Sequence, residues 1–315
     1  MENFYKIGSF SNTPLSLPGW LKWNEQKWNV KAEHLVYKKN GSEFPKLEGI
    51  VYRDNKGRVV MPRLNPYLPF EFTDSTLKHY KLYNDYQDVM MLFINDLEKL
   101  GISKGFALPP GFIDARPFQW RNYMVDMSYT FVQDMNSFYD SAKHIKKNIN
   151  KAIQNGYTVE NSRDWSAIMY CLSGTETVKS FKHHLSVNDM QNCEDLLGSD
   201  VFRGYLVRDK LKQPVAGGIR LVMKDGITID WVEGAVFEHL KYGVNQLIYQ
   251  YVLNDSQKAG ALYFDWCGAN ISAVALAKSA WGVPIMPHFM IMKKSLKNML
   301  YSYYKPQVKK ILGKS

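Results

Sequence analysis

The chain has 315 residues and a formal net charge of +10, from 40 Lys and Arg residues against 30 Asp and Glu residues. Hydrophobic residues make up 45% of it and aromatic residues 14%, which is ample for a buried core and excludes an intrinsically disordered protein. The three cysteines are too few and too scattered for a metal site or a disulfide framework. The length predicts two domains of ordinary size or one large domain.

The sequence predicts neither a membrane-spanning helix nor a secretory signal. No apolar run reaches the roughly 18–20 residues that a membrane-spanning helix needs. Residues 1–17 contain Glu2 and lack an apolar centre, so we predict no secretory signal. We therefore expect a cytoplasmic protein. Its basic charge favours phosphate-bearing partners such as coenzyme A, nucleotide-linked sugars, tRNA or an anionic membrane surface, without choosing among them.

Residues 1–123 are predicted to form a self-contained α/β unit. Strands are expected at 33–38 and 47–53, and a turn at 54–57 leads into a third strand at 58–61. A long helix over 76–100 follows, and Gly101 ends it. The apolar stripe of this helix consists of Leu77, Tyr80, Val89, Leu92, Phe93 and Leu97.

The connector over residues 108–120 has no periodicity and contains three prolines. We interpret it as the crossing between two units, and long irregular connections are often functional. Trp120 and Arg121 at its end would suit the wall of a substrate site. Packing between the two units is the alternative interpretation.

The second unit, 124–315, opens with a strand at 124–132 that contains Tyr129, a candidate ligand contact. A helix is then expected between a cap at Asn136 or Ser137 and a stop at Asn155 and Gly156. Its buried face is predicted to contain Phe138, Ala142, Ile145, Ile149 and Ala152. Lys143, Lys146, Lys147 and Lys151 lie on its other side, either as a solvated face or as a ledge for phosphates.

The remaining pattern predicts helices, then antiparallel strands, then a helix between two further strands. The expected helices are 165–172, 187–197 and 244–259, and the expected strands are 201–207, 215–223, 226–236 and 261–267. Gly268 and Asn270 then turn the chain into a short apolar helix.

Lys278 lies on this last helix, in the stripe formed by Ile271, Val274 and Ala275. It is the only formally charged side chain between Asp265 and Lys293. A buried ammonium group is costly unless an anion or another partner meets it. Lys278 is therefore either a functional group or part of a structural ion pair, for instance with Asp265.

Two motifs in this region resemble a known family signature. Phe264-Asp265-Trp266-Cys267-Gly268 and, further on, Ala277-Lys278-Ser279-Ala280-Trp281-Gly282 are similar to the Phe-Asp-x-x-Gly and Phe-Lys-x-x-Phe-Gly motifs of Fem peptidyltransferases and their GNAT-fold relatives. Ala277 and Trp281 replace the usual aromatic residues. The basic helix that ends at 151–156 with Lys-Ala-x-x-x-Gly is also similar to these proteins.

This resemblance implies an α/β (α+β) fold of tandem GNAT-like domains, each a mixed twisted sheet flanked by helices. In that fold the strands at 226–236 and 261–267 lie parallel and splay apart, and the acyl donor sits in the gap. Its pyrophosphate meets the start of the next helix, where Tyr242, Gly243 and Asn245 replace the usual loop motif. Only one of that motif's two glycines is present here. Trp266 and Asn270 are further candidate contacts.

The implied reaction is attack of an amine on an activated acyl group. Lys278 is expected to stabilise the oxyanion, and Glu233 or Asp265 is expected to act as the base. Asp230 is a further carboxylate for which a plain salt bridge is the favoured interpretation. The resemblance implies no metal.

Acyl-CoA is the favoured donor, because no long coiled-coil arm of the kind found in some tRNA-using members is present. The expected acceptor is an amine on a cell-envelope precursor or an amino sugar of a surface polysaccharide. One alternative is an aminoacyl-tRNA-dependent Fem-type peptidyltransferase acting on a peptidoglycan precursor. Another is a non-catalytic, degenerate GNAT binding module.

The last segment, 293–315, has seven lysines and no acidic residue. Leu296, Met299, Leu300 and Tyr303 fall at helical spacing within it, which predicts an amphipathic basic helix. Such a helix would bind the inner surface of an anionic membrane. A solvated terminal helix is the alternative.

Overall fold

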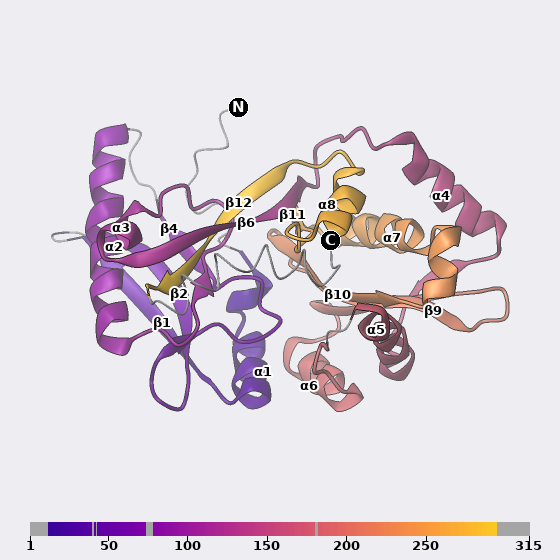
Figure 1. Ribbon diagram of the computed structural model, residues 1–315, viewed down its shortest axis with the longest axis horizontal. Helices are drawn as coiled ribbons and strands as arrows, with labels where there is room; N and C mark the ends of the chain where they lie inside the picture. Colours follow the sequence, from indigo (N-terminus) through magenta and orange to yellow (C-terminus); the bar gives the residue numbers. More distant parts are fainter. Residues whose placement is uncertain (1–11, 40, 42, 74–77, 180–181, 295–315) are drawn as a thin grey trace, which may run out of the picture.

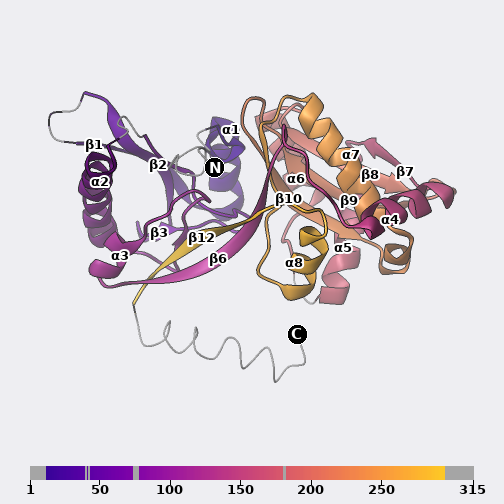
Figure 2. The same cartoon turned by 90° about the horizontal axis from the view of Figure 1, so that it is seen from above.

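The computed structural model of the protein describes residues 12–39, 41, 43–73, 78–179 and 182–294. Two halves lie side by side, and two long strands, β6 (Tyr123–Asp134) and β12 (Ile285–Lys293), run from one half into the other (Figures 1 and 2). The strands form a four-stranded sheet and an eight-stranded sheet.

The N-terminal half is built around the four-stranded antiparallel sheet. Its strands are β1 (Lys31–Lys38), β2 (Pro45–Arg53), β3 (Val59–Val60) and β4 (Phe70–Phe72). The long helix α2 (His79–Leu100) packs against this sheet and ends at Gly101, as predicted. Its buried face is Tyr86, Val89, Met90, Phe93, Ile94 and Leu97. These residues follow helical spacing and bury one continuous stripe.

The predicted burial of two residues on the α2 stripe is wrong. Tyr80 is 63% exposed and Leu92 is 44% exposed, because they lie off the face that the later residues bury against the sheet. Leu77 lies outside the described residues. Along the chain, the short strand β5 (Phe106–Ala107) and the short helix α3 (Arg116–Trp120) follow α2. Only α3 lies within the segment 108–120 that was predicted to be irregular.

The C-terminal half contains most of the eight-stranded sheet, in the order β5-β12-β6-β11-β10-β9-β8-β7. The helices α4 and α7 lie over one face and α5 and α6 over the other (Figure 1). The helices are α4 (Lys143–Gln154), α5 (Trp165–Lys179), α6 (Val187–Leu197) and α7 (Val244–Lys258). The other strands are β7 (Thr158–Asn161), β8 (Phe202–Arg208), β9 (Pro214–Leu221), β10 (Ile227–Ala235) and β11 (Tyr263–Asp265).

The helix α4 begins later than predicted. Asn136 and Ser137 do not cap it, because the N–H group of Ala142 donates to the carbonyl of Ala280 and the helix starts only at Lys143. Phe138 therefore lies outside the helix and is 91% exposed. Three other predicted members of the buried face, Ile145, Ile149 and Ala152, are buried.

An unpredicted helix, α1 (Pro18–Trp28), joins the core of the other half. Trp20 and Trp23 stack with ring centroids 5.1 Å apart, and both meet the edge of Trp231 from β10. Gly19 lets α1 approach α6, since a Cβ atom there would lie 2.2 Å from the carbonyl oxygen of Leu196. The N-terminal residues thus complete the C-terminal core.

The strand β12, also unpredicted, pairs with β6 from Ile285↔Phe131 to Lys293↔Tyr123. Its far end pairs with β5, and Ile291 is fully buried in the N-terminal core. The two halves therefore share the eight-stranded sheet, and the division of the chain at residue 123 stays a prediction. Within the described ranges, no helix is both long and apolar enough to cross a bilayer.

Candidate functional site

The strands β10 and β11 pair in parallel and then separate. Their register runs from Ile227↔Tyr263 to Ile229↔Asp265, after which β10 continues to Ala235 without β11. The chain after Asp265 stays with β6, because the N–H group of Trp266 donates to the carbonyl of Phe131 over 2.9 Å. The predicted parallel pair that splays apart is confirmed.

A β-bulge in β10 places two carboxylates on the same side. Residues three apart on a regular strand point to opposite faces. The pairing of β10 with β9 shifts register between Asp230 and Val232, so one extra residue is inserted. As a result, Asp230 and Glu233 both reach the same guanidinium group, that of Arg220 on β9.

Arg220 is completely buried between these carboxylates. Its Nε atom lies 2.9 Å from Oδ1 of Asp230, and its Nη2 atom donates to Oε2 of Glu233. The guanidinium carbon also lies 5.4 Å from the ring centroid of Tyr249 and 6.0 Å from that of Tyr205. Burial of a charge is thus offset by two ion pairs and two aromatic faces.

Lys278 joins the same cluster. Its ammonium group lies 3.1 Å from Oδ2 of Asp230, and it donates to the carbonyl of Cys267 over 2.7 Å and to the carbonyl of Trp266. An ammonium group has three N–H donors, so these three acceptors use all of them. The expected pair with Asp265 is wrong, because Asp230 takes that place.

The helix that carries Lys278, α8 (Ser272–Ser279), is not the buried stripe that the sequence predicts. None of its residues is fully buried, Leu276 is 69% exposed, and Ile271 before it is 58% exposed. Ala275 packs against the core at its edge, and the Lys278 side chain reaches inward, where it is 12% exposed. The lysine therefore anchors an otherwise surface-lying helix.

Asp265 sits apart from this cluster in a buried polar contact between the halves. Its carboxylate accepts hydrogen bonds from the hydroxyl of Tyr67 (3.0 Å), the hydroxyl of Thr130 and the N–H group of Cys267 (2.9 Å). Complete burial raises the pKa of the Asp265 carboxyl despite these donors. The nearby His288 ring has its pKa lowered, because burial disfavours its charged form.

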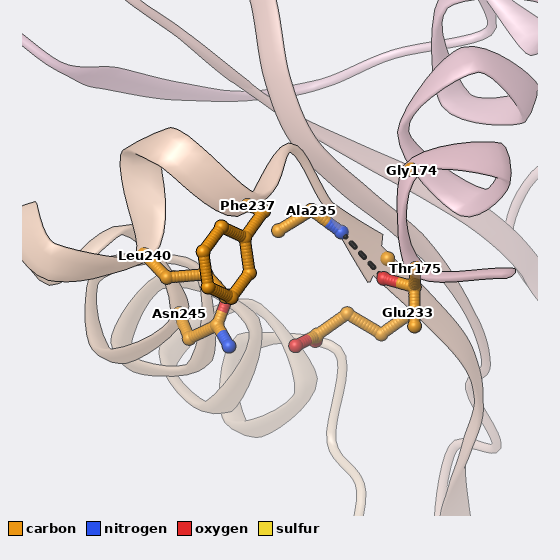
Figure 3. Close-up of a pocket in the computed structure, with 8 residues that line it drawn as sticks. Gly174, Thr175, Glu233, Ala235, Phe237, Leu240 and Asn245 are labelled. Carbon is orange, nitrogen blue, oxygen red and sulfur yellow. Dashed lines mark hydrogen bonds between the residues drawn. The ribbon is translucent and has the colours of Figure 1, made fainter. Parts of the chain in front are cut away.

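Glu233 lines a cavity of about 110 Å³ at the start of α7. Its carboxylate points toward the side-chain amide of Asn245, with the ring of Phe237 beside them (Figure 3). The N–H group of Ala235, on the strand edge that β11 has left, donates to the Thr175 hydroxyl over 3.0 Å. The cavity is lined by Gly174, Thr175, Glu233, Gly234, Ala235, Phe237, Leu240 and Asn245.

The ionisation of Glu233 is set by two opposing influences. Burial raises the pKa of its carboxyl, and the neighbouring charge of Asp230 acts in the same direction. The guanidinium of Arg220 opposes both, yet the pKa stays above its usual value. A carboxyl of this kind lies closer to neutral pH than an exposed one, which suits proton transfer.

The predicted donor loop contacts α4. The 3₁₀ helix η2 (Phe237–Tyr242) ends at Gly243, whose φ is 87° and whose Cβ, if present, would lie 2.3 Å from the carbonyl oxygen of Asn148. Only glycine fits there. The ammonium group of Lys151 donates to the carbonyl of Lys241 over 2.8 Å and lies 5.7 Å from the ring centroid of Tyr242.

The other predicted contacts divide between the site and distant surfaces. Trp266 is fully buried and stacks on Tyr249 with ring centroids 4.8 Å apart. The Asn270 side chain bonds both the N–H and the carbonyl of Tyr129, which fixes the chain after β11 against β6. These three residues surround the diverging strands.

Four predicted residues lie elsewhere. Lys146 and Lys147 are exposed on α4. Trp120 is 58% exposed on α3, and Arg121 pairs with Glu98 of α2. Figures 1 and 2 place α2 and α3 at the outer end of the N-terminal half, away from β10. The structure therefore does not bring Trp120 and Arg121 to the site.

Arg220, Tyr249 and Thr175 are site residues that the sequence reasoning missed. Arg220 carried a usable signal, because it is a single charge within the apolar run Ala216–Val222. That is the same signal that singled out Lys278. Tyr249 and Thr175 carry no such signal, since both types are common on helices.

No family model and no curated protein sequence matches the chain. Solved structures do match its fold. A structure of FemX is 11% identical, with 96% of this chain and 97% of that chain covered and a TM-score of 0.61. The C-terminal domain (DUF2156) of a putative lysylphosphatidylglycerol synthetase from Agrobacterium fabrum is 8% identical, with coverages of 95% and 92% and a TM-score of 0.57. L-PGS from Bacillus licheniformis is 12% identical, with coverages of 95% and 93% and a TM-score of 0.56.

At these identities the similarity concerns the fold alone. It extends over nearly the whole of each chain. The predicted fold class, tandem GNAT-like domains with mixed sheets flanked by helices, is confirmed by this similarity and by the sheet topology.

Proposed function

We propose that the protein is an N-acyltransferase that joins an activated acyl group to an amine on a cell-envelope precursor or on an amino sugar of a surface polysaccharide. The observation that carries the proposal is Glu233, a partly buried carboxylate that lines a cavity beyond the point where β10 and β11 separate. The fold shared with FemX, with a domain of a putative lysylphosphatidylglycerol synthetase and with L-PGS supports a transferase that acts in envelope biosynthesis.

Glu233 is the best candidate for the base among the three carboxylates. Asp230 is buried, contacts Arg220, Lys278 and Tyr249, and is absent from the cavity lining. Asp265 is completely buried, bonded by three donors and absent from the cavity lining. We assign Asp265 to holding the two halves together. Glu233 alone of the three faces open space.

In the proposed step, the amine nitrogen attacks the acyl carbonyl carbon and a C–N bond forms. The Glu233 carboxylate takes a proton from that nitrogen. The bond from the acyl carbon to its carrier then breaks, and the carrier's sulfur or oxygen leaves with the electron pair and takes up the proton that Glu233 removed, which restores the carboxylate. The products are an amide and the free carrier.

Lys278 is the proposed stabiliser of the negative charge on the acyl oxygen. Its ammonium group lies at the strand separation, where it bonds the carbonyls of Trp266 and Cys267. The acyl oxygen would replace one of these carbonyls as an acceptor, so the same charge would serve the developing oxyanion.

Acyl-CoA remains the favoured donor, with charged tRNA as the alternative. Helix α7 starts at Gly243 without a side-chain cap, so the N–H groups of its first turn are available to an anion. Lys151 and Tyr242 lie beside this turn. The exposed Lys146 and Lys147 would extend the basic surface toward a longer, phosphate-bearing donor.

The proposed reaction takes place in the cytoplasm at the inner membrane surface, where envelope precursors are reached. The basis is the lysine-rich end of the chain. Lys294, the last described residue, is exposed directly after β12. The predicted amphipathic helix at 295–315 lies outside the described residues.

Binding and transfer should be measured together on the full-length protein. Titration with acetyl-CoA and with charged tRNA identifies the donor, and transfer of a labelled acyl group to amino sugars and to lipid-linked amines identifies the acceptor. Glu233→Gln should lower the transfer rate by about 10²–10⁴-fold. The control is Glu238→Gln. Glu238 is an exposed acidic residue on η2, just after β10, and its replacement should leave the rate unchanged.

Two results would reject the proposed reaction. A Glu233→Gln protein with the wild-type rate would show that another group is the base. Binding of a donor without any turnover would support the non-catalytic binding module instead.

A further inference from the structure

Arg220 is a completely buried charge in the middle of a sheet strand, where a charge is costly. The surrounding chain is shaped to receive it. A Cβ atom on Gly218 would lie 2.2 Å from Nη1 of Arg220, so glycine at that position leaves room for the guanidinium. The bulge in β10 then brings two carboxylates to the same group. Local features on two strands thus converge on one side chain.

The guanidinium is held on several sides. Its Nε atom faces Asp230, its Nη2 atom faces Glu233 and its Nη1 atom lies 3.4 Å from the carbonyl oxygen of Val232. A planar guanidinium can bond two carboxylates in fixed directions, whereas an ammonium group acts as a point charge. The orientation of Glu233 therefore depends on Arg220.

Two other titratable groups near Glu233, Lys278 of α8 and Tyr249 of α7, are bound to Asp230 instead. The Lys278 ammonium group and the Tyr249 hydroxyl contact Oδ2 of Asp230 at 3.1 and 2.7 Å. Arg220 is thus the cation in direct contact with Glu233 among the described residues. Asp230 acts on Glu233 with the opposite sign.

We infer that Arg220 is a positioning residue, which keeps the Glu233 carboxylate ionised and directed into the cavity. The inference rests on the proposed function in one respect, the role of Glu233 as the base. Among the described residues, the ion pairs and hydrogen bonds of the Arg220 side chain reach one residue of the cavity lining, Glu233, so Arg220 acts through that residue. The Nη2 atom of Arg220 binds Glu233, while its Nε atom is held by Asp230.

A purely structural role for Arg220 predicts something different. In that case its removal would lower the stability of the sheet and leave the titration of Glu233 where it was. A positioning role predicts that the midpoint of the Glu233 titration moves, because an adjacent opposite charge commonly lowers a carboxyl pKa by about 1–3 units. The titration of this one carboxyl therefore separates the two roles.

The experiment is an NMR titration of the full-length protein labelled with ¹³C in the glutamate carboxyl groups. Glu233→Gln assigns the signal. Arg220→Met should raise the Glu233 midpoint by about 1–3 units, since the stabilising cation is lost while burial remains. Arg220→Lys keeps the charge but not the fork, and should give a smaller upward shift.

The matched control is Arg203→Met on the neighbouring strand. Arg203 stands directly opposite Arg220 in the sheet and pairs with Asp255. Its loss should reduce stability, though by less than the loss of the buried Arg220, without the shift in Glu233. An unchanged Glu233 midpoint in Arg220→Met would overturn the inference. If that variant does not fold, an unchanged midpoint in Arg220→Lys overturns it equally.

The pH profile of transfer gives a second readout. The acidic limb of kcat/KM should move to higher pH in Arg220→Lys by the same amount as the NMR midpoint, because a protonated base is inactive. The titration needs no substrate. A shifted Glu233 midpoint in a protein without transfer activity would therefore uphold the positioning role and reject the proposed function. An unshifted midpoint in a protein with transfer activity would reject the positioning role alone.

Discussion

Replacing Lys278 with methionine separates its two possible contributions, to stability and to rate. The side chain is 12% exposed and its ammonium group bonds three acceptors. After the substitution Asp230 keeps Arg220 at 2.9 Å and the Tyr249 hydroxyl at 2.7 Å, so this carboxylate is not left unpaired. The carbonyl groups of Trp266 and Cys267 lose a donor instead.

The expected loss of stability follows from these contacts. Hydrogen bonds to a charged group contribute about 1.5–3 kcal/mol each, but burying the ammonium group offsets part of that sum. We expect a net loss of roughly 2–3 kcal/mol, less than the loss for a carboxylate stripped of its only partner. A role in oxyanion stabilisation would separately lower the rate by about 10²–10³-fold, or 3–4 kcal/mol.

Guanidinium unfolding at pH 7 measures the first quantity, and transfer rate per folded molecule measures the second. Lys258→Met is the matched control, because this lysine lies exposed in the last turn of α7. A Lys278→Met protein as stable as the control would refute the anchoring role. A protein that is less stable but keeps its rate would show that Lys278 is a structural group only.

Three further predictions follow from the described contacts. Gly19→Ala should lower stability, because the added Cβ would lie 2.2 Å from the Leu196 carbonyl oxygen. In an ordinary helix the same change usually stabilises by about 1 kcal/mol. Thermal melting measures the sign of the effect, and an increase in Tm would contradict the close approach. Stability should fall as pH drops below about 6.5, by up to ~1.4 kcal/mol per pH unit, because the pKa of His288 is lowered on folding and the unfolded chain binds the proton first. The His288→Gln protein should lose less stability over that pH range, as measured by denaturant titrations. Parallel curves of unfolding free energy against pH for the two proteins would exclude His288 as the source. Flotation with anionic vesicles should depend on salt and on residues 295–315, with ~1 kcal/mol per lysine near the surface; equal recovery of the truncated protein would exclude membrane binding by the tail.

The sequence predicted the elements whose periodicity is strong. The strands β6 and β8 to β11 and the helix before β11 were found, because their apolar residues follow one regular spacing. The short strand β7 was not predicted. α1 was missed because its tryptophans pack against a distant strand, which no local pattern reveals. β12 was missed for a similar reason, since Pro287 and His288 interrupt its apolar run.

The site was predictable only in part. Lys278 and Glu233 do belong to one cluster, which Arg220 and Asp230 link. Arg220 was missed although it is a single charge in an apolar run, and the bulge that brings the two carboxylates together leaves no sequence pattern. The expected pair of Lys278 with Asp265 failed for a tertiary reason. Tyr67 from the other half and Thr130 of β6 already occupy that carboxylate. Such choices among partners depend on packing between segments far apart in the sequence.

The placement of β12 also constrains how the chain acquires its structure during synthesis. β5, which holds Phe106, pairs with β12, and Ile291 completes the apolar interior beside it. The ribosome releases the N-terminal half first, whereas β12 is made only after the other elements of the C-terminal half. Until then, the nascent N-terminal half carries an unpaired strand edge and uncovered apolar surface, of the kind that chaperones bind.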